Sequence, residues 1–150
     1  MTGLGDFLGL FMLLSGYVIG LGAVTVIDLH GILSRRSSYW TETTARTHKV
    51  TRPLIWLGVG LVIIGAAIFY RGDYGAFIPT VHAALLALLV LNGLFVSFRV
   101  TPFLLVRESE GRASELLPDA LQHKIAFAFA VSTIAWWGSL ALLVWYVLGR

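Results

Sequence analysis

Apolar and polar residues alternate along this chain in long blocks. Four apolar stretches contain no charged side chain, and they lie at residues 7–27, 53–70, 77–98 and 125–148. A helix needs ~20 mostly apolar residues to cross the ~30 Å hydrocarbon core of a bilayer. Because lipid offers no hydrogen-bond partners, each stretch is expected to be helical. The pattern therefore predicts an all-α integral membrane protein, a four-helix bundle with up-down topology.

The composition agrees with this pattern. Hydrophobic residues make up 57% of the chain and charged residues 13%, with a mean hydropathy of +0.83. At 150 residues, the chain is expected to be one transmembrane domain, 1–150, without a separate soluble module. The first stretch lacks the basic leader and small-residue cleavage site of a signal peptide, so we expect a retained helix. The absence of cysteine excludes disulfides, thiolate metal sites and a cysteine nucleophile.

The basic residues predict the orientation in the membrane. Of 11 lysines and arginines, nine lie in or beside the first and third connections, whereas the second connection has only Arg71 and the C-terminus only Arg150. Short loops rich in Lys and Arg stay in the cytoplasm. We therefore expect connections one and three in the cytoplasm and both termini outside. The basic residues adjoin apolar stretches instead of forming a solvent-facing patch, so the net charge of +3 does not indicate nucleic-acid binding.

The first connection is predicted to contain a short interfacial helix. Ser38 suits a helix N-cap, and Tyr39 and Trp40 suit the lipid headgroup level. We expect this helix to end near Arg52, because Pro53 follows.

The other two connections carry turn signals. Residues 71–75, RGDYG, predict a tight turn, so the second and third spans are expected to pack as an antiparallel hairpin. The third connection has a charged turn at 107–112. Pro118 and Asp119 then suit the first turn of a short helix leading into the fourth span.

Small residues recur on one face of three spans. They are Gly9, Gly16, Gly20 and Ala23 in the first span, Thr51, Gly58 and Gly65 in the second, and Ala130, Gly138 and Ala141 in the fourth. Close helix packing in lipid relies on such residues, and we expect these faces to meet at the bundle axis. Trp136 and Trp137 are expected to pack against glycine-rich faces, or alternatively to line a flat cofactor.

The four histidines are the candidates for function. A neutral imidazole is the commonest metal ligand and a frequent axial ligand of haem. His30 follows the small-residue face of the first span by a heptad step, and His123 shares a face with Ala130, so both are expected to point inward at matching depth. With His48 as a third ligand, they predict a site for haem b or a transition-metal ion. The alternatives are amphipathic side chains at headgroup level for His48 and His123, and a helix C-terminal cap for His30.

His82 lies about two turns into the third span and has no histidine partner at its depth. The nearest candidates are Tyr70 and Tyr146. His82 is therefore either a cofactor ligand, alone or with a residue of another subunit, or a buried side chain that is hydrogen-bonded to a neighbouring hydroxyl.

Two further polar residues fall in or next to the apolar stretches. Asp28 is expected to orient His48 or to pair with a cation of the next helix, Lys49 or Arg52. Asn92 is expected to form an interhelical hydrogen bond with one of three side chains, Ser132, Thr133 or Ser139.

The third span also resembles a known group of membrane proteins. Residues 81–93, VHAALLALLVLNG, resemble the third span of copper-resistance-D-like proteins, a group similar to haem-binding membrane protoporphyrinogen oxidases. The shared pattern is a His-x-Lys start followed later in the helix by His-Gly. His82 and Gly93 match it, whereas Ala84 and Asn92 replace the lysine and the second histidine. The resemblance implies a small helical membrane protein that binds haem.

The sequence thus predicts a small polytopic membrane protein that binds haem b or a metal ion through its histidines and takes part in electron transfer. The alternative is a non-catalytic subunit or assembly factor whose small-residue faces dock partner transmembrane helices. Its partners would be the lipid bilayer and other membrane subunits or copies of itself. No paired membrane carboxylates or phosphate-binding glycine loop indicate hydrolase chemistry, and four spans are too few for inverted-repeat transport within one chain.

Overall fold

The structure, a computed structural model, describes residues 3–34, 40–112, 115 and 117–149, with the backbone alone for 31–34 and 40–45. These residues form helices and turns, and no strand occurs among them. The helices are α1 (Leu4–Ser34), α2 (Trp40–Phe69), α3 (Phe77–Phe95), the π-helix η1 (Val96–Val100), α4 (Thr101–Ser109) and α5 (Asp119–Leu148).

Four helical segments are long and apolar enough to cross a membrane. They are Leu4–His30, Arg46–Phe69, Phe77–Ser109 and Asp119–Leu148. Large apolar side chains cover the outside of the bundle; Val18 is 76% exposed and Phe127 is 72% exposed. Such a surface is stable in lipid and prone to aggregation in water. The predicted all-α transmembrane four-helix bundle is therefore confirmed.

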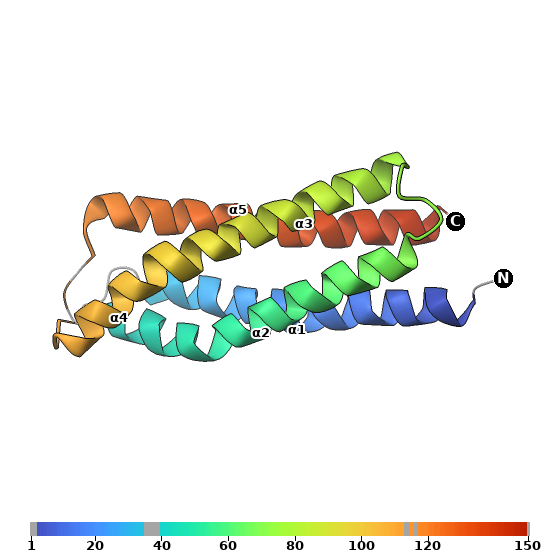
Figure 1. Ribbon diagram of the computed structural model, residues 1–150. Coiled ribbons are helices and arrows are strands. Elements are labelled where there is room, and N and C mark those ends of the chain that lie inside the picture. Colours follow the sequence, from blue (N-terminus) through green and yellow to red (C-terminus); the bar gives the residue numbers. More distant parts are fainter. Residues whose placement is uncertain (1–2, 35–39, 113–114, 116, 150) are drawn as a thin grey trace.

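The helices form two antiparallel pairs, α1 with α2 and α3 with α5 (Figure 1). Both termini and the α2–α3 turn lie at one end of the bundle, which we call the terminal end. The other two connections lie at the opposite end, which we call the loop end (Figure 1). The up-down topology is confirmed. The close α2–α3 hairpin is wrong, because α2 makes its extensive contact with α1 and touches α3 only slightly.

Glycines explain why α1 and α2 approach so closely. A Cβ atom added to Gly58 would lie 2.5 Å from the Cα of Gly20 and 2.8 Å from the carbonyl oxygen of Gly16. One added to Gly65 would lie 2.6 Å from the backbone nitrogen of Leu13. No side chain fits between the two backbones at these points. The prediction that the small-residue faces of the first two spans meet is confirmed.

The predicted inner face of the fourth span is wrong. Ala130 and Ala141 are exposed, and Trp137 is 55% exposed. The buried face of α5 instead carries Ile125, Ala128, Ala135, Trp136, Ser139 and Leu143. Because α5 is apolar on every side, small-residue spacing did not reveal its orientation. Trp136 packs over Gly20 of α1 as expected for a tryptophan against a glycine.

Among the described residues of the two loop-end connections, no separate interfacial helix occurs. The backbone of α2 is helical from Trp40 through Pro53 to Phe69, so the expected stop before this proline is wrong. Proline is tolerated in membrane helices because neighbouring groups satisfy the freed backbone. Ser38 and Tyr39 lie outside the described residues. In the third connection, α3 continues through η1 into α4, and α5 itself begins at Asp119.

Candidate functional site

His82 is fully buried between two tyrosine hydroxyls. Its Nε2 atom lies 2.7 Å from the hydroxyl of Tyr17, and its Nδ1 atom lies 2.8 Å from the hydroxyl of Tyr70. Tyr17 belongs to α1, Tyr70 follows α2, and His82 belongs to α3. We call these three residues the tyrosine–histidine cluster. It joins three helices through hydrogen bonds at the terminal half of the bundle.

Helical periodicity directs these side chains inward. His82 shares the buried face of α3 with Pro79, Leu86 and Leu89. Tyr17 lies on the buried face of α1 with Leu13 and Leu21. Side chains in a helix lean toward its N-terminus, which for α1 is the terminal end. This lean brings the Tyr17 hydroxyl toward His82.

The sequence interpretation therefore found part of the cluster. Tyr70 was named from its depth, and hydrogen bonding to a hydroxyl was one of the two interpretations of His82. Tyr17 was missed, although its position next to Gly16 on the close-packed face of α1 was a usable signal.

The two hydrogen bonds of His82 differ in direction: the ring donates one and accepts the other. A neutral imidazole has one N–H group and one acceptor nitrogen. His82 therefore donates to one tyrosine and accepts from the other. The Tyr70 ring packs edge-on against Tyr146 with centroids 4.9 Å apart, and the Tyr146 hydroxyl donates to the carboxylate of Asp73 in the α2–α3 turn. Polar groups thus continue from His82 toward the terminal end.

A second polar region, the inner cavity, lies in the loop half of the bundle between α1, α2, α3 and α5. Its volume is about 70 Å³. A water molecule needs ~10–15 Å³ of such volume, so the cavity has room for a few waters. Typical ligand pockets measure ~300–1,000 Å³. The polar side chains that line the cavity are Asp28, His48, Arg52, Asn92, Ser97 and Ser132.

Asp28 and Asn92 have partners that the sequence did not identify. The carboxylate of Asp28 accepts a hydrogen bond from the Thr133 hydroxyl at 3.0 Å. Its predicted ion pair is wrong, because Lys49 pairs with Glu108 on α4, and no hydrogen bond joins Asp28 to His48. The amide of Asn92 donates to the carbonyl oxygen of Ala128 at 2.9 Å. This bond is interhelical as expected, but its acceptor is backbone.

His48 is buried beside the inner cavity and contacts Thr101. The His48 Nε2 atom lies 2.6 Å from the Thr101 hydroxyl oxygen, and that hydroxyl donates to the carbonyl oxygen of Val96 at 3.1 Å. Because a hydroxyl has one proton to donate, the Nε2 atom of His48 is the donor and carries hydrogen. The π-turn of η1 positions Thr101, since the Thr101 amide also bonds to Val96. Such π-turns often occur at functional sites.

The other two histidines do not join these regions. His123 is exposed on α5, so its predicted inward direction is wrong; the inner face at this depth passes through Ile125 and Ala128. His30 is half-buried on α1, and the helix continues to Ser34, so a C-terminal cap at His30 is also wrong. Among the described residues, no three His, Cys, Asp or Glu side chains gather as a metal site. The structure therefore does not bring His30, His48 and His123 together as one.

Trp136 lies between the two polar regions. Its ring lines the inner cavity and packs edge-on against Tyr17, with centroids 5.9 Å apart and an interplanar angle of 78°. Ser139, one turn further along α5, is fully buried and donates to the Trp136 carbonyl oxygen at 3.0 Å. The tyrosine–histidine cluster and the inner cavity are thus separated by one aromatic side chain.

Comparisons with protein-family models, curated proteins and solved structures found no match for this chain. The resemblance of residues 81–93 to copper-resistance-D-like proteins stays a prediction.

Proposed function

We propose that the protein transfers protons through its helical bundle, with His82 as the carrier between Tyr17 and Tyr70. The observation that supports this function is a fully buried imidazole with a hydroxyl group at each ring nitrogen. Ionisable residues inside membrane proteins are costly, and chains of them often form proton relays. A histidine held in this way has a proton donor on one side and an acceptor on the other.

The transfer needs no electron carrier. One tyrosine hydroxyl gives its proton to the free ring nitrogen of His82, and the N–H on the opposite side of the ring gives its proton to the second tyrosine oxygen. That tyrosine releases its original proton onward, and the first tyrosine takes a proton from its other side. One proton has then crossed the cluster, and every hydrogen bond has reversed its direction. Rotation of the hydroxyls and tautomer exchange of His82 restore the starting state.

The route extends from the cluster in both directions. Toward the terminal end, Tyr146 and Asp73 continue the polar groups to the exposed α2–α3 turn. Toward the loop end, waters in the inner cavity would connect Asp28 and His48 with the side of Trp136 that faces the cavity. Movement of the Trp136 ring would join the two regions.

The direct test measures proton flux into liposomes that contain the purified protein and a trapped pH-sensitive dye, driven by a potassium diffusion potential. We expect a protein-dependent flux that His82→Phe removes and that Tyr17→Phe strongly reduces. Tyr74→Phe is the matched control, because Tyr74 is exposed and its hydroxyl bonds to the carbonyl oxygen of Ala67. A wild-type flux equal to that of empty liposomes would refute the proposal. A folded His82→Phe protein with full flux would also refute it. The cluster would then only stabilise the packing of the helices.

The direction of transfer depends on the orientation, which the basic residues predict with the loop end in the cytoplasm. Cysteines placed at Gly72 and at Ser109 test it, since the native chain has none. With an impermeant thiol reagent on intact cells, we expect labelling at position 72 and protection at position 109. The reverse pattern would invert the proposed direction.

Binding of haem b or a metal ion stays a prediction of the sequence. In the structure both ring nitrogens of His82 contact hydroxyls, and the Nε2 atom of His48 contacts Thr101. Ligation through these atoms requires breaking those hydrogen bonds. An absorption spectrum with added haem, together with elemental analysis of the purified protein, tests the prediction.

The alternative of a subunit that docks partner helices through its small-residue faces has less support. Gly16, Gly58 and Gly65 are covered within the chain by the α1–α2 contact. They are therefore not free for a partner helix.

A further inference from the structure

A groove with basic side chains opens between the start of the second span and α4. Its volume is about 290 Å³, and it is lined by His48, Lys49, Arg52, Pro53, Thr101, Leu104 and Leu105. We call it the basic groove. It is separate from the tyrosine–histidine cluster and lies at the loop end of the bundle.

Arg52 is the charge in this groove that lacks compensation. Among the residues that the structure describes, the half-buried Arg52 has no ion pair or hydrogen bond of its side chain. Two carboxylates of neighbouring elements make their identified contacts with other groups: Glu108 forms an ion pair with Lys49, and Asp28 accepts a hydrogen bond from Thr133. A guanidinium in a membrane segment is costly without an anion. Its planar fork suits a phosphate, which it can bind through two parallel hydrogen bonds.

The position of the groove in the membrane and its apolar lining both suit a lipid. Arg52 directly precedes the charge-free apolar stretch 53–70, so it stands at one end of the apolar part of the second span. This places Arg52 near the level of lipid headgroups. Pro53, Leu104 and Leu105 add an apolar wall, and Leu105 is 40% exposed. Basic pockets between membrane helices bind anionic headgroups in this way.

We infer that the basic groove binds the phosphate group of an anionic phospholipid. Arg52 holds the phosphate through its fork, Lys49 contributes a second positive charge from the rim, and an acyl chain runs along the exposed Pro53 and Leu105. The groove shares His48 and Arg52 with the inner cavity, but lipid binding does not require proton transfer through His82, so either proposal can fail without the other.

Native mass spectrometry of the intact protein in detergent tests this site. The probes are phosphatidylglycerol and phosphatidylcholine with identical acyl chains. We expect selective retention of phosphatidylglycerol, about tenfold weaker retention for Arg52→Gln, and a smaller loss for Lys49→Gln. Arg71→Gln is the matched control, because Arg71 pairs with Asp6 at the opposite end of the bundle. Equal retention of the two lipids would overturn the proposal.

A competition arm separates a lipid from a soluble anion. Inorganic phosphate at millimolar concentration is expected to leave phosphatidylglycerol bound, because it gains nothing from the apolar wall. Displacement by phosphate would assign the groove to a free anion and overturn the lipid assignment. If Arg52→Gln does not fold, Arg52→Lys replaces it, because lysine keeps the charge and loses the fork. We expect Arg52→Lys to retain less phosphatidylglycerol than wild type. The double variant Lys49→Gln, Arg52→Lys should retain less still. Retention by Arg52→Lys equal to wild type would refute a role for the fork.

Discussion

The bundle buries two histidines in different ways. His82 is completely enclosed, and its ring nitrogens contact the hydroxyls of Tyr17 on α1 and of Tyr70, which directly follows α2. His48 has one identified partner, Thr101, and faces a cavity of about 70 Å³. Buried polar groups are costly unless they are hydrogen-bonded. His82 meets this demand with protein groups alone, whereas the Nδ1 atom of His48 depends on what occupies the space beside it.

This difference separates a fixed site from an adaptable one. At His82 the three helices are held by specific hydrogen bonds, so a change there affects both the packing and the proposed proton route. At His48 the cavity allows water or a nearby ligand to replace a lost contact. The two histidines should therefore respond differently to the same substitution, and the predictions below test that difference.

The largest effect is expected at the glycine contact between α1 and α2. Gly58→Leu places a side chain where even a Cβ would lie 2.5 Å from the backbone of Gly20. We expect loss of stable folding, or destabilisation above ~3 kcal/mol, since overpacking alone costs ~1–3 kcal/mol. Unfolding in mixed detergent, followed by circular dichroism, measures it.

Gly60 provides the control for that substitution. It lies on the same helix, and a Cβ added there meets nothing within 4 Å. Gly60→Leu should unfold like wild type. Equal behaviour of the two variants would show that the α1–α2 contact is looser than described.

His82→Leu should have the next largest effect. It removes the hydrogen bonds of His82 to the hydroxyls of Tyr17 and Tyr70, and the loss of one partner in a buried hydrogen bond costs ~1–3 kcal/mol. We expect destabilisation of about 3 kcal/mol in the same unfolding measurement. Adding Tyr17→Phe to His82→Leu should recover part of the loss, because the buried hydroxyl that has lost its His82 partner is then removed. A purely additive loss would contradict the hydrogen-bonded cluster.

His48→Leu should cost less, about 1 kcal/mol. The Thr101 hydroxyl retains its bond to the carbonyl oxygen of Val96, and the cavity accommodates the altered side chain. The measurement is again detergent unfolding, with Thr101→Val as the reciprocal variant. A loss at His48 equal to that at His82 would remove the distinction between the two sites.

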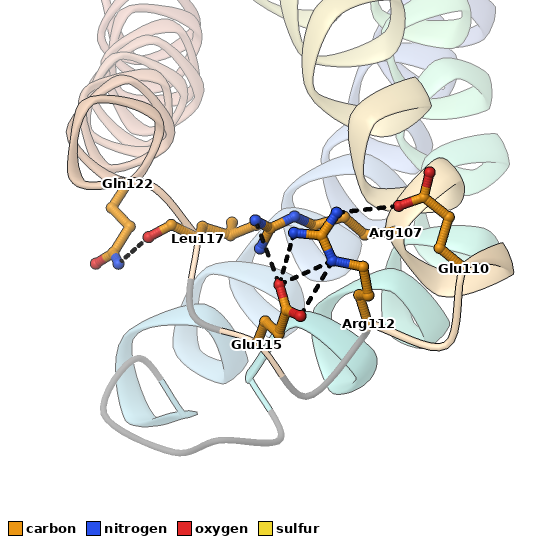
Figure 2. Close-up of polar contacts among 6 residues, drawn as sticks. All are labelled: Arg107, Glu110, Arg112, Glu115, Leu117 and Gln122. Atoms are coloured by element: carbon orange, nitrogen blue, oxygen red, sulfur yellow. Dashed lines mark hydrogen bonds and ion pairs between the residues drawn. The ribbon is translucent and has the colours of Figure 1, made fainter.

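The smallest effect belongs to the charged turn at the loop end, where the third span ends. Arg107 and Arg112 converge on the carboxylate of Glu115, which lies 2.9 Å from an Arg112 nitrogen (Figure 2). The hydrogen bond and charge of Arg112 lower the pKa of the Glu115 carboxyl below its ordinary value. Any stabilisation of the folded protein by this carboxylate is therefore present at pH values above its ordinary pKa. It is lost as the pH falls through the lowered pKa of the folded state. Exposed pairs contribute little, so Glu115→Gln should leave unfolding near neutral pH unchanged. Carboxyl NMR titration should show an upward shift of the Glu115 midpoint in Arg112→Gln.

Much of the architecture followed from local pattern. Charge-free apolar stretches predicted the four membrane helices, and the spacing of Gly16, Gly20 and Gly58 predicted the face on which α1 meets α2. Both inferences depend on properties that neighbouring residues share along one helix. The sequence also predicted that Asn92 forms an interhelical hydrogen bond, because a buried side-chain amide needs a hydrogen-bond partner.

The inner face of α5, the partner of Asp28 and the position of Tyr17 beside His82 were decided only by the tertiary structure. An apolar helix in lipid has no polar side to mark its orientation, so the direction of His123 could not be read from spacing. The π-turn before Pro102 sets the position of Thr101 opposite His48, and it depends on how α3 continues into α4. The sequence determined by itself that the chain enters a membrane and which faces of α1 and α2 carry the small residues that allow close packing. Which side chains meet inside was determined by rotations of whole helices, and these depend on contacts between residues far apart in the chain.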